Sequence, residues 1–403
     1  MSTSRTQHAS PPFRAEHVGS LLRTQALLEK REAFDKGQCT LEEVRTVEDL
    51  AVEHVCRVQL ETGIGSITDG EYRRGMFFEG VFDQLEGMTI IPNRPINEFK
   101  EYIPHIKMMY RFGVPAADSI YCTGKIKRTK PFYTHSFQHL KSLVPPEQVG
   151  HIKVNICSPT WFHQRHGSDL TYDGAVYETD TEYFTDLALA YQQEFRDLYD
   201  LGCRHIQIDD PTLAYFCDEN MISGMKEAGV DHEALLDTYI NAINLCTQER
   251  PADLRVSVHL CRGNFKGGQH FSSGGYGRIA RKLFNDLDVD VYFLEYDDER
   301  SGDFEPLKHV PLGKKVVLGI MSSKTAVLET SGYLKSRVNE AAEVLMRGYP
   351  PRLKEVALDQ LCISPQCGFA ATWEGNHLTE EDEIQKLRLL VTTANEIWGE
   401  EAS

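Results

Sequence analysis

Four residues far apart in the chain have side chains of the types that bind a transition-metal ion. His259 and Cys261 are two positions apart, so on an extended strand they point to the same side, and Glu295 and Cys367 end later apolar runs. Two thiolates, an imidazole and a carboxylate suit tetrahedral Zn2+. The alternative is that the histidine and the cysteines are ordinary core residues. Because the four residues come from three separate runs rather than from close Cys-x-x-Cys pairs, the sequence favours a zinc ion that a substrate can reach.

A second group of polar residues could hold a substrate beside that ion. Glu71 and Asp209 each end an apolar run, and two carboxylates at one mouth can bind an ammonium group or act as general acid and base. They could instead cap the helices that follow. Gly19 and Ser20 lie at a predicted strand-to-helix turn, where free backbone N–H groups suit a carboxylate. Together these residues predict a site for a zwitterionic amino acid whose side chain meets the metal.

These residues lie at the ends of short apolar runs that alternate with amphipathic stretches. Most of the runs are apolar on both faces, which is typical of parallel strands covered by helices. The amphipathic stretches have apolar residues at three- and four-residue steps, which predicts helices at 41–62, 181–201, 232–248, 336–347 and 379–398. The predicted strands are 13–20, 66–71, 151–160, 204–211, 254–261, 289–296, 315–320 and 360–367.

Eight strands alternating with helices predict an α/β fold, the (β/α)8 TIM barrel, whose functional residues gather at the C-terminal ends of the strands. A doubly wound open sheet is the rival, but no glycine-rich dinucleotide motif follows the first strand. We expect residues 1–12 to form a flexible tail and residues 13–403 a single catalytic barrel. Residues 88–148 predict a β-hairpin insertion after strand two, with strand-like pieces at 105–112 and 120–127.

The composition limits the class of protein. Of the 403 residues, 41% are hydrophobic and 26% are charged, which supplies a sizeable core and argues against disorder. No apolar run approaches the length of about 18 residues that a membrane span needs. The formal net charge of -17 argues against a general binder of nucleic acid or of anionic membranes, because such a protein needs a basic face.

Ten cysteines raise the question of the compartment. The polar segment from Met1 to Pro12 has no apolar core typical of a secretory signal, so we expect a cytoplasmic protein with thiols or metal ligands rather than disulfides. Most of the cysteines lie among apolar residues and are expected to be small buried side chains, such as Cys56, Cys157, Cys203 and Cys246.

In their order along the chain, these motifs resemble those of cobalamin-independent methionine synthase, specifically its C-terminal catalytic barrel. The His-x-Cys pair, Glu295 and Cys367-Gly368 are similar to that family's zinc site, and the shared order from about residue 13 onward makes the resemblance specific. The length is similar to that of the short, single-barrel homologues. The other similar segments are Val18-Gly19-Ser20, Asp69-Gly70-Glu71, Ser158-Pro159-Thr160 and Ile208-Asp209-Asp210-Pro211.

The resemblance implies a zinc-dependent methyltransferase that moves a methyl group to the thiol of homocysteine and so makes methionine. Zinc lowers the pKa of the thiol, and the thiolate then attacks the methyl donor. It implies that the substrates are small molecules, with no part for nucleic acid or a membrane. The implied zinc ligands are His259, Cys261, Glu295 and Cys367, of which Glu295 moves as the sulfur enters. The implied homocysteine ligands are Glu71 and Asp209 for the ammonium, and Ser20 with the Val18 backbone for the carboxylate.

Three departures from the family pattern leave the methyl donor open. We expect one barrel, whereas the full-length synthase has a second that helps to hold the folate tail. The family's Asp-x-His at the end of strand seven, which is implicated in protonating the leaving group, is replaced by Met321-Ser322-Ser323-Lys324, so another acid is needed, such as Lys324 or His163. Asp210 stands where the family has glutamate.

The methyl donor is therefore expected to be methyltetrahydrofolate, a methylated corrinoid or another S- or N-methyl compound. Aromatic residues after two strand ends could stack a flat donor or could close the barrel against its helices. These are Trp161, Phe162, Tyr215 and Phe216. The functional alternatives are a zinc-thiolate transferase for a different thiol or electrophile and a non-catalytic metal-binding homologue.

Overall fold

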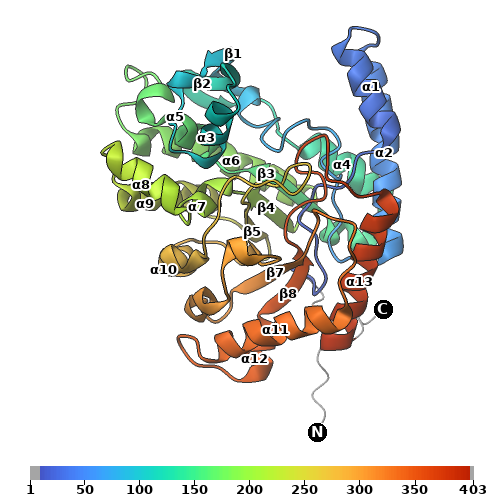
Figure 1. Ribbon diagram of the computed structural model, residues 1–403. Coiled ribbons are helices and arrows are strands. Elements are labelled where there is room, and N and C mark those ends of the chain that lie inside the picture. The colour runs from blue at the N-terminus through green and yellow to red at the C-terminus, as the bar shows by residue number, and fades with distance from the viewer. Residues whose placement is uncertain (1–9, 400–403) are drawn as a thin grey trace.

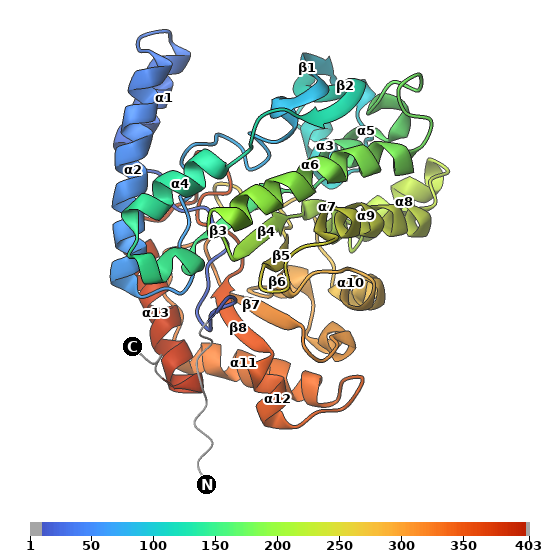
Figure 2. The same cartoon turned by 180° about the vertical axis from the view of Figure 1, so that it is seen from behind.

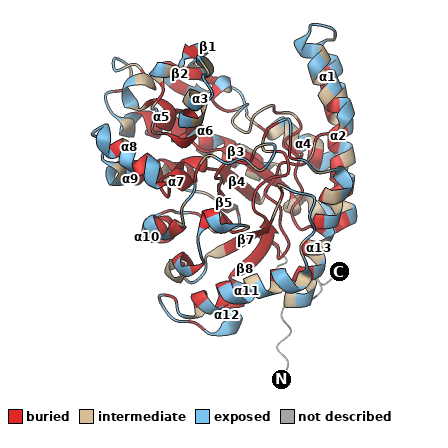
Figure 3. Cartoon of the chain, viewed as in Figure 1, coloured by how far each residue is buried: buried red, intermediate tan, exposed pale blue. Residues whose placement is uncertain are grey.

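The computed structural model describes residues 10–399, so most of the predicted tail lies outside the described residues, whereas Pro11 and Pro12 are buried. The centre of the molecule is a parallel sheet in which each strand pairs with the next along the chain (Figure 1). All residues of this sheet's six strands except Arg255 and Lys315 are buried (Figure 3), which confirms the predicted parallel α/β fold. The strands are β3 (Lys153–Cys157), β4 (His205–Asp209), β5 (Arg255–Leu260), β6 (Val291–Glu295), β7 (Lys315–Met321) and β8 (Leu361–Pro365).

Helices connect most of the strands and cover the outside of the sheet (Figure 2). The longest, α2, has its predicted bounds because a Thr40–Glu43 capping box starts it and Gly63, with φ of 73°, ends it. Within residues 10–399 no helix has the length and hydropathy needed to cross a membrane. The helices are α1 (Gln25–Asp35), α2 (Leu41–Thr62), α4 (Thr134–Leu143), α5 (Trp161–His166), α6 (Asp180–Asp200), α7 (Pro211–Tyr215), α8 (Glu219–Glu227), α9 (His232–Thr247), α10 (Ala280–Asn285), α11 (Ser331–Met346), α12 (Lys354–Asp359) and α13 (Glu380–Trp398).

The first two of the eight predicted strands are not strands. Ala15 forms a single parallel bridge to β8, and Ile67 forms a single parallel bridge to the residue before β3. Positive φ angles at Gly19 (147°), Gly70 (63°) and Glu71 (61°) turn both segments out of an extended course soon after these bridges. Each segment nevertheless lies at one edge of the six-stranded sheet.

The long excursion after the second segment holds an antiparallel pair of strands and a helix between them. The strand predicted at 120–127 is confirmed, but the one predicted at 105–112 is wrong. Pro104 lies in the first turn of a helix there, a position where proline's missing N–H costs nothing. In Figure 1 this group lies at the upper left, beside α5. Its elements are β1 (Leu85–Pro95), α3 (Pro104–Arg111) and β2 (Ala116–Arg128).

The ten cysteines lie mostly inside the fold. None of them forms a disulfide, and eight are buried. The four that were singled out as core residues, Cys56, Cys157, Cys203 and Cys246, are among the buried ones. Cys261 and Cys367 are different, because they face each other.

Candidate functional site

Side-chain alternation along the central strands brings the predicted site residues to one face of the sheet. Val291 and Phe293 of β6 form a small apolar cluster with residues of β7 and β8, and Glu295 continues this alternating series at the end of the strand. His259 of β5 is in register with Phe293, and Asp209 of β4 is in register with His259. The polar groups therefore gather over the C-terminal ends of the strands.

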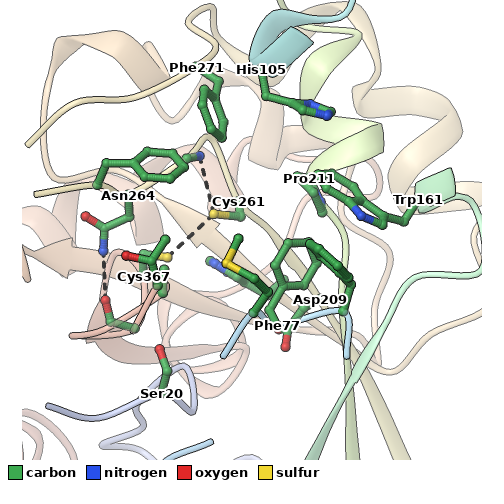
Figure 4. A pocket seen from close by; sticks show the side chains of 18 of the residues that line it. Ser20, Phe77, His105, Trp161, Asp209, Pro211, Cys261, Asn264, Phe271 and Cys367 are labelled. Carbon is green, nitrogen blue, oxygen red and sulfur yellow. Dashed lines mark hydrogen bonds between the residues drawn. The ribbon is translucent and has the colours of Figure 1, made fainter. Parts of the chain in front are cut away.

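The four predicted metal ligands form one cluster. One ligand atom from each of His259, Cys261, Glu295 and Cys367 lies within 4.8 Å of all the others. The two sulfur atoms are 3.5 Å apart, close to the ~3.8 Å that tetrahedral zinc requires when its Zn–S bonds are ~2.3 Å long. Figure 4 shows Cys261 and Cys367 pointing toward each other across the site.

His259 provides a test of whether a metal fits this cluster. Its side chain is only 2% exposed, yet neither ring nitrogen has a hydrogen-bond partner among residues 10–399. Buried polar atoms in proteins are nearly always partnered, so the orphaned imidazole needs a ligand. Sulfur, nitrogen and carboxylate donors at these distances match zinc chemistry, and the residues present fit the ion.

The two cysteine sulfur atoms are close enough for a hydrogen bond in which either can be the donor. This hydrogen bond lowers the pKa of Cys261 well below its usual range despite burial, and His259 and the N–H of Gly263 act in the same direction. The same hydrogen bond, together with burial, raises the pKa of Cys367. The cluster thus favours at least one thiolate, the form of cysteine that binds metals.

Glu295 lies beneath the other three ligands and is fully buried. Its Oε1 accepts a hydrogen bond from the backbone N–H of Arg262 at 2.8 Å, and its Oε2 accepts one from Arg300 at 2.5 Å. Burial raises the pKa of Glu295 to about 7, against the pull of the Arg300 charge. Both carboxylate oxygens are therefore held by the protein itself.

A cavity of about 460 Å³ opens over this cluster (Figure 4). Most of its lining is apolar, and its polar floor contains seven of the eight predicted site residues. Glu295 is the exception, because it lies below the floor. The seven are Val18, Ser20, Glu71, Asp209, His259, Cys261 and Cys367.

Two buried carboxylates stand beside the metal cluster. Asp209 accepts hydrogen bonds from Gln207 at 2.7 Å and from Asn155 at 3.0 Å, so each of its oxygens keeps a further lone pair for a ligand. Glu71 Oε1 lies 3.8 Å from Arg74, and burial raises the pKa of Glu71 to about 7 against that charge. Burial also raises the pKa of Asp209. Two desolvated acids side by side suit a cationic partner.

Glu71 has a strained backbone, with φ of 61°. A side chain other than glycine or asparagine in this region costs about 1–2 kcal/mol. The backbone N–H of Glu71 donates a hydrogen bond of 2.9 Å to Asp69 Oδ1, which helps to hold the turn. Strain of this kind is typical of functional sites, and here it points a carboxylate into the cavity.

Ser20 and Val18 form another part of the floor. The carbonyl of Val18 accepts hydrogen bonds from Asn155 and Gln207, so its N–H is the backbone group that could meet a carboxylate. Ser20 packs directly against Gly368, where an added Cβ would lie 1.8 Å from the serine Oγ. The glycine after Cys367 is therefore required for Ser20 to reach the cavity.

Three residues that the sequence singled out lie elsewhere. Asp210 points away from the cavity and caps α7 by accepting a hydrogen bond from the backbone of Leu213, so the change from glutamate does not alter the cavity lining. Lys324 forms an ion pair with Asp297 at 2.7 Å, and His163 is bound by neighbours at both ring nitrogens. None of the three lines the cavity. Lys324 and His163, which the sequence suggested as acids for the leaving group, therefore do not face it.

Two of the four aromatic residues singled out in the sequence reach the cavity. Trp161 and Tyr215 line the cavity, whereas Phe162 and Phe216 are buried outside it. Sequence reasoning missed many of the lining residues, among them the titratable side chains of His105 in α3 and Arg165 in α5. Neither residue lies in a motif. Residues 105–112 were expected to form a strand, and a strand would orient the His105 side chain differently from the helix that is present.

The sequence from Asp209 to Cys367 lies within the part of the chain that matches a known family. Residues 175–396 match the family model described as "Cobalamin-independent synthase, Catalytic domain". The chain belongs to this family. Family membership supports a methyltransferase of the cobalamin-independent synthase type.

Relatives of several lengths are found within the family. Protein YxjH of Bacillus subtilis, described as uncharacterized, is 36% identical over 388 residues, which are 96% of this chain and 95% of YxjH. A 5-methyltetrahydropteroyltriglutamate–homocysteine methyltransferase of Flavobacterium johnsoniae is 21% identical over 89% of this chain, which spans 39% of that longer protein. A Listeria monocytogenes structure provisionally described as a vitamin-B12 independent methionine synthase has 32% identity and a TM-score of 0.72, with 97% and 99% of the two chains covered.

Proposed function

We propose that this protein is a zinc-dependent methyltransferase that transfers a methyl group to the thiol of homocysteine and so produces methionine. The observation that carries the proposal is the cluster of four ligand residues from three strand ends, with two buried carboxylates beside it on one cavity floor. When bound there, zinc would lower the pKa of a coordinated thiol so that the sulfur is nucleophilic near neutral pH.

The cavity floor matches the two charged groups of an amino-acid acceptor. Glu71 and Asp209 would accept hydrogen bonds from the ammonium, and their burial makes each of these contacts stronger than a surface ion pair. The Ser20 hydroxyl and the Val18 N–H would donate to the carboxylate. The acceptor's thiol then points to the cysteine pair, because both ends of its backbone are fixed on the floor.

Glu295 can leave the ligand set without becoming an unpaired buried charge. Arg300 and the N–H of Arg262 already hold both of its oxygens. With zinc bound, His259 and the two cysteines would hold the ion, and Glu295 would be able to give way to the sulfur of the acceptor. This arrangement supports the expectation that Glu295 is the exchangeable ligand.

Metal content tests the first half of the proposal. Purified protein should contain about one zinc ion per chain, and Cys261→Ser should lose it, because the cluster has no other residue to replace that sulfur. Cys39→Ser is the matched control, since Cys39 lies outside the cavity and should leave the zinc content unchanged. Full zinc content in the Cys261→Ser protein would remove the assignment.

Calorimetry with homocysteine tests the second half. Titration in buffers of different ionisation enthalpy should show release of a proton from the thiol on binding. Cysteine, whose side chain is one methylene shorter, is the control acceptor and should bind more weakly because its thiol falls short of the cluster. Equal binding of both thiols would favour the alternative, a transferase for a different acceptor.

We also propose that the two edge segments close the sheet into the predicted (β/α)8 barrel. Glu16 N donates to Ile363 O of β8 at 2.8 Å, and Ile67 N donates to His151 O, next to β3, at 3.0 Å. Gly65 N donates to Ala15 O at 3.2 Å and links the two segments to each other. Slow hydrogen exchange of these three amides, comparable to that of β3 and β8, is the expected result.

A further inference from the structure

One wall of the cavity carries hydrogen-bond donors that have no acceptors. Trp161 Nε1, Arg165 Nε and Nη1, and the hydroxyl of Tyr215 all lack a partner within residues 10–399, as do both ring nitrogens of His105. All four side chains line the cavity, and each is at least nine-tenths buried. Several orphaned donors on one buried wall indicate a ligand that accepts hydrogen bonds.

Arg165 is the strongest of these groups. Its Nε and Nη1 have no hydrogen-bond partner within the described part of the chain, although the residue is only 5% exposed. Its guanidinium lies 5.0 Å from the ring of Phe99 and 5.5 Å from that of Trp161, so aromatic faces cover it. Stacking satisfies the faces of a guanidinium but not the N–H groups along its edge, which still need acceptors.

His105 completes the wall from a different segment of the chain. Its ring stacks on Trp161 with the centroids 4.7 Å apart, and it comes from α3 of the excursion rather than from the sheet. Burial and the charge of Arg165 hold the pKa of His105 well below its usual range, so the imidazole is neutral. It can therefore donate one hydrogen bond without adding a second positive charge.

We propose that Arg165 and His105, with Trp161 Nε1 and the Tyr215 hydroxyl, bind a carboxylate of the methyl donor. This inference rests on the proposed function, because the floor of the cavity is already assigned to the acceptor. A carboxylate fits better than a phosphate, since the wall offers one positive charge and the floor carries the acids Glu71 and Asp209. A doubly charged group would be repelled by that floor.

Binding of a simple aromatic acid tests the wall without turnover. Benzoate is the probe and benzamide its neutral control, because the two differ only in the group that would meet Arg165. Wild-type protein should prefer benzoate, and Arg165→Met should reduce its affinity by about tenfold or more, since a charge-assisted hydrogen bond is lost. Arg165→Lys should keep part of the preference.

Two further variants separate binding from support of the fold. His105→Phe keeps a ring against Trp161 and removes both nitrogens, and it should weaken benzoate binding by a few-fold with an unchanged melting temperature. Arg204→Gln is the matched control, because Arg204 also stacks on a tyrosine, at 4.1 Å, but pairs with Asp253 outside the cavity. Benzoate binding in this control should equal that of the wild type.

The stability and the acceptor affinity of the Arg165→Met protein decide the interpretation. An unpaired buried charge destabilises the unliganded fold, so the variant should melt at the same temperature as the wild type or higher. A large fall in melting temperature, or equal binding of benzoate and benzamide by the wild type, would overturn the proposal. A loss of homocysteine affinity in this variant would overturn it too, because Arg165 would then bind the acceptor. Absence of zinc in the wild type would instead refute the proposed function.

Discussion

Asp209→Asn is the most informative substitution on the cavity floor. In the native protein the two aspartate oxygens accept hydrogen bonds from Gln207 and Asn155, and their free lone pairs face the predicted ammonium. An asparagine keeps one acceptor, but in either orientation its NH2 group meets a neighbouring amide NH2. We therefore expect the fold to lose about 1–3 kcal/mol of stability, the cost of an unsatisfied buried donor.

The effect on ligand affinity follows from the same contact. Losing a charge-assisted hydrogen bond costs about 1.5–3 kcal/mol, so the Kd for homocysteine should rise about ten- to hundredfold. Calorimetry on zinc-loaded protein measures this change. 4-Mercaptobutyrate, which is homocysteine without its amino group, is the control ligand and should bind the variant and the wild type equally well.

Two results would refute this reasoning. If the variant binds homocysteine as tightly as the wild type, Asp209 does not contact the ammonium. If it loses 4-mercaptobutyrate in equal measure, the substitution has damaged the metal cluster instead. Asp118→Asn removes an exposed carboxylate from the rim of the same cavity, and it should change neither affinity.

Three further predictions concern other groups described above. Because the pKa of Glu71 is raised to about 7, its negative charge is lost as the pH falls from 8 to 6. The ratio of homocysteine affinity to 4-mercaptobutyrate affinity should therefore fall over the same range. A constant ratio in calorimetric titrations would argue against Glu71 as a ligand of the ammonium. Gly368→Ala places a Cβ 1.8 Å from Ser20 Oγ and should weaken homocysteine binding at least tenfold, whereas Gly332→Ala, where the nearest atom is 4.0 Å away, should have no effect. Burial raises the pKa of Glu383 to about 8, so the folded chain holds a proton that the unfolded chain releases near pH 4. The free energy of unfolding should therefore fall by up to ~1.4 kcal/mol per pH unit as the pH rises between these values. Urea unfolding at pH 6 and pH 8 measures this slope, and Glu383→Gln should remove it.

The sheet and the metal cluster could be anticipated because both depend on local pattern. Runs that are apolar on both faces mark buried parallel strands, and polar residues at their ends mark the functional edge. The register then decides which of two adjacent acids faces inward. Asp209 is on the inner side with His259, whereas Asp210 faces outward and caps a helix.

The upper part of the cavity could not be anticipated in the same way. The run from 105 to 112 has apolar residues that fit a strand or a helix, and the proline that starts the helix lies just before it. His105 and Arg165 have no shared spacing, so their approach to Trp161 appears only once the chain is folded. Their orphaned nitrogens are likewise a property of the cavity and not of any motif.

The wall and the floor of the cavity come from different parts of the chain, and this has a consequence for how the protein can change. The floor contains residues at the ends of β4, β5 and β8, whereas His105 comes from α3, between the paired strands β1 and β2. The other three residues of the wall, Trp161, Arg165 and Tyr215, belong to α5 and α7. Replacing residues 85–128 would therefore change the wall at His105 and leave Arg165 and the floor in place.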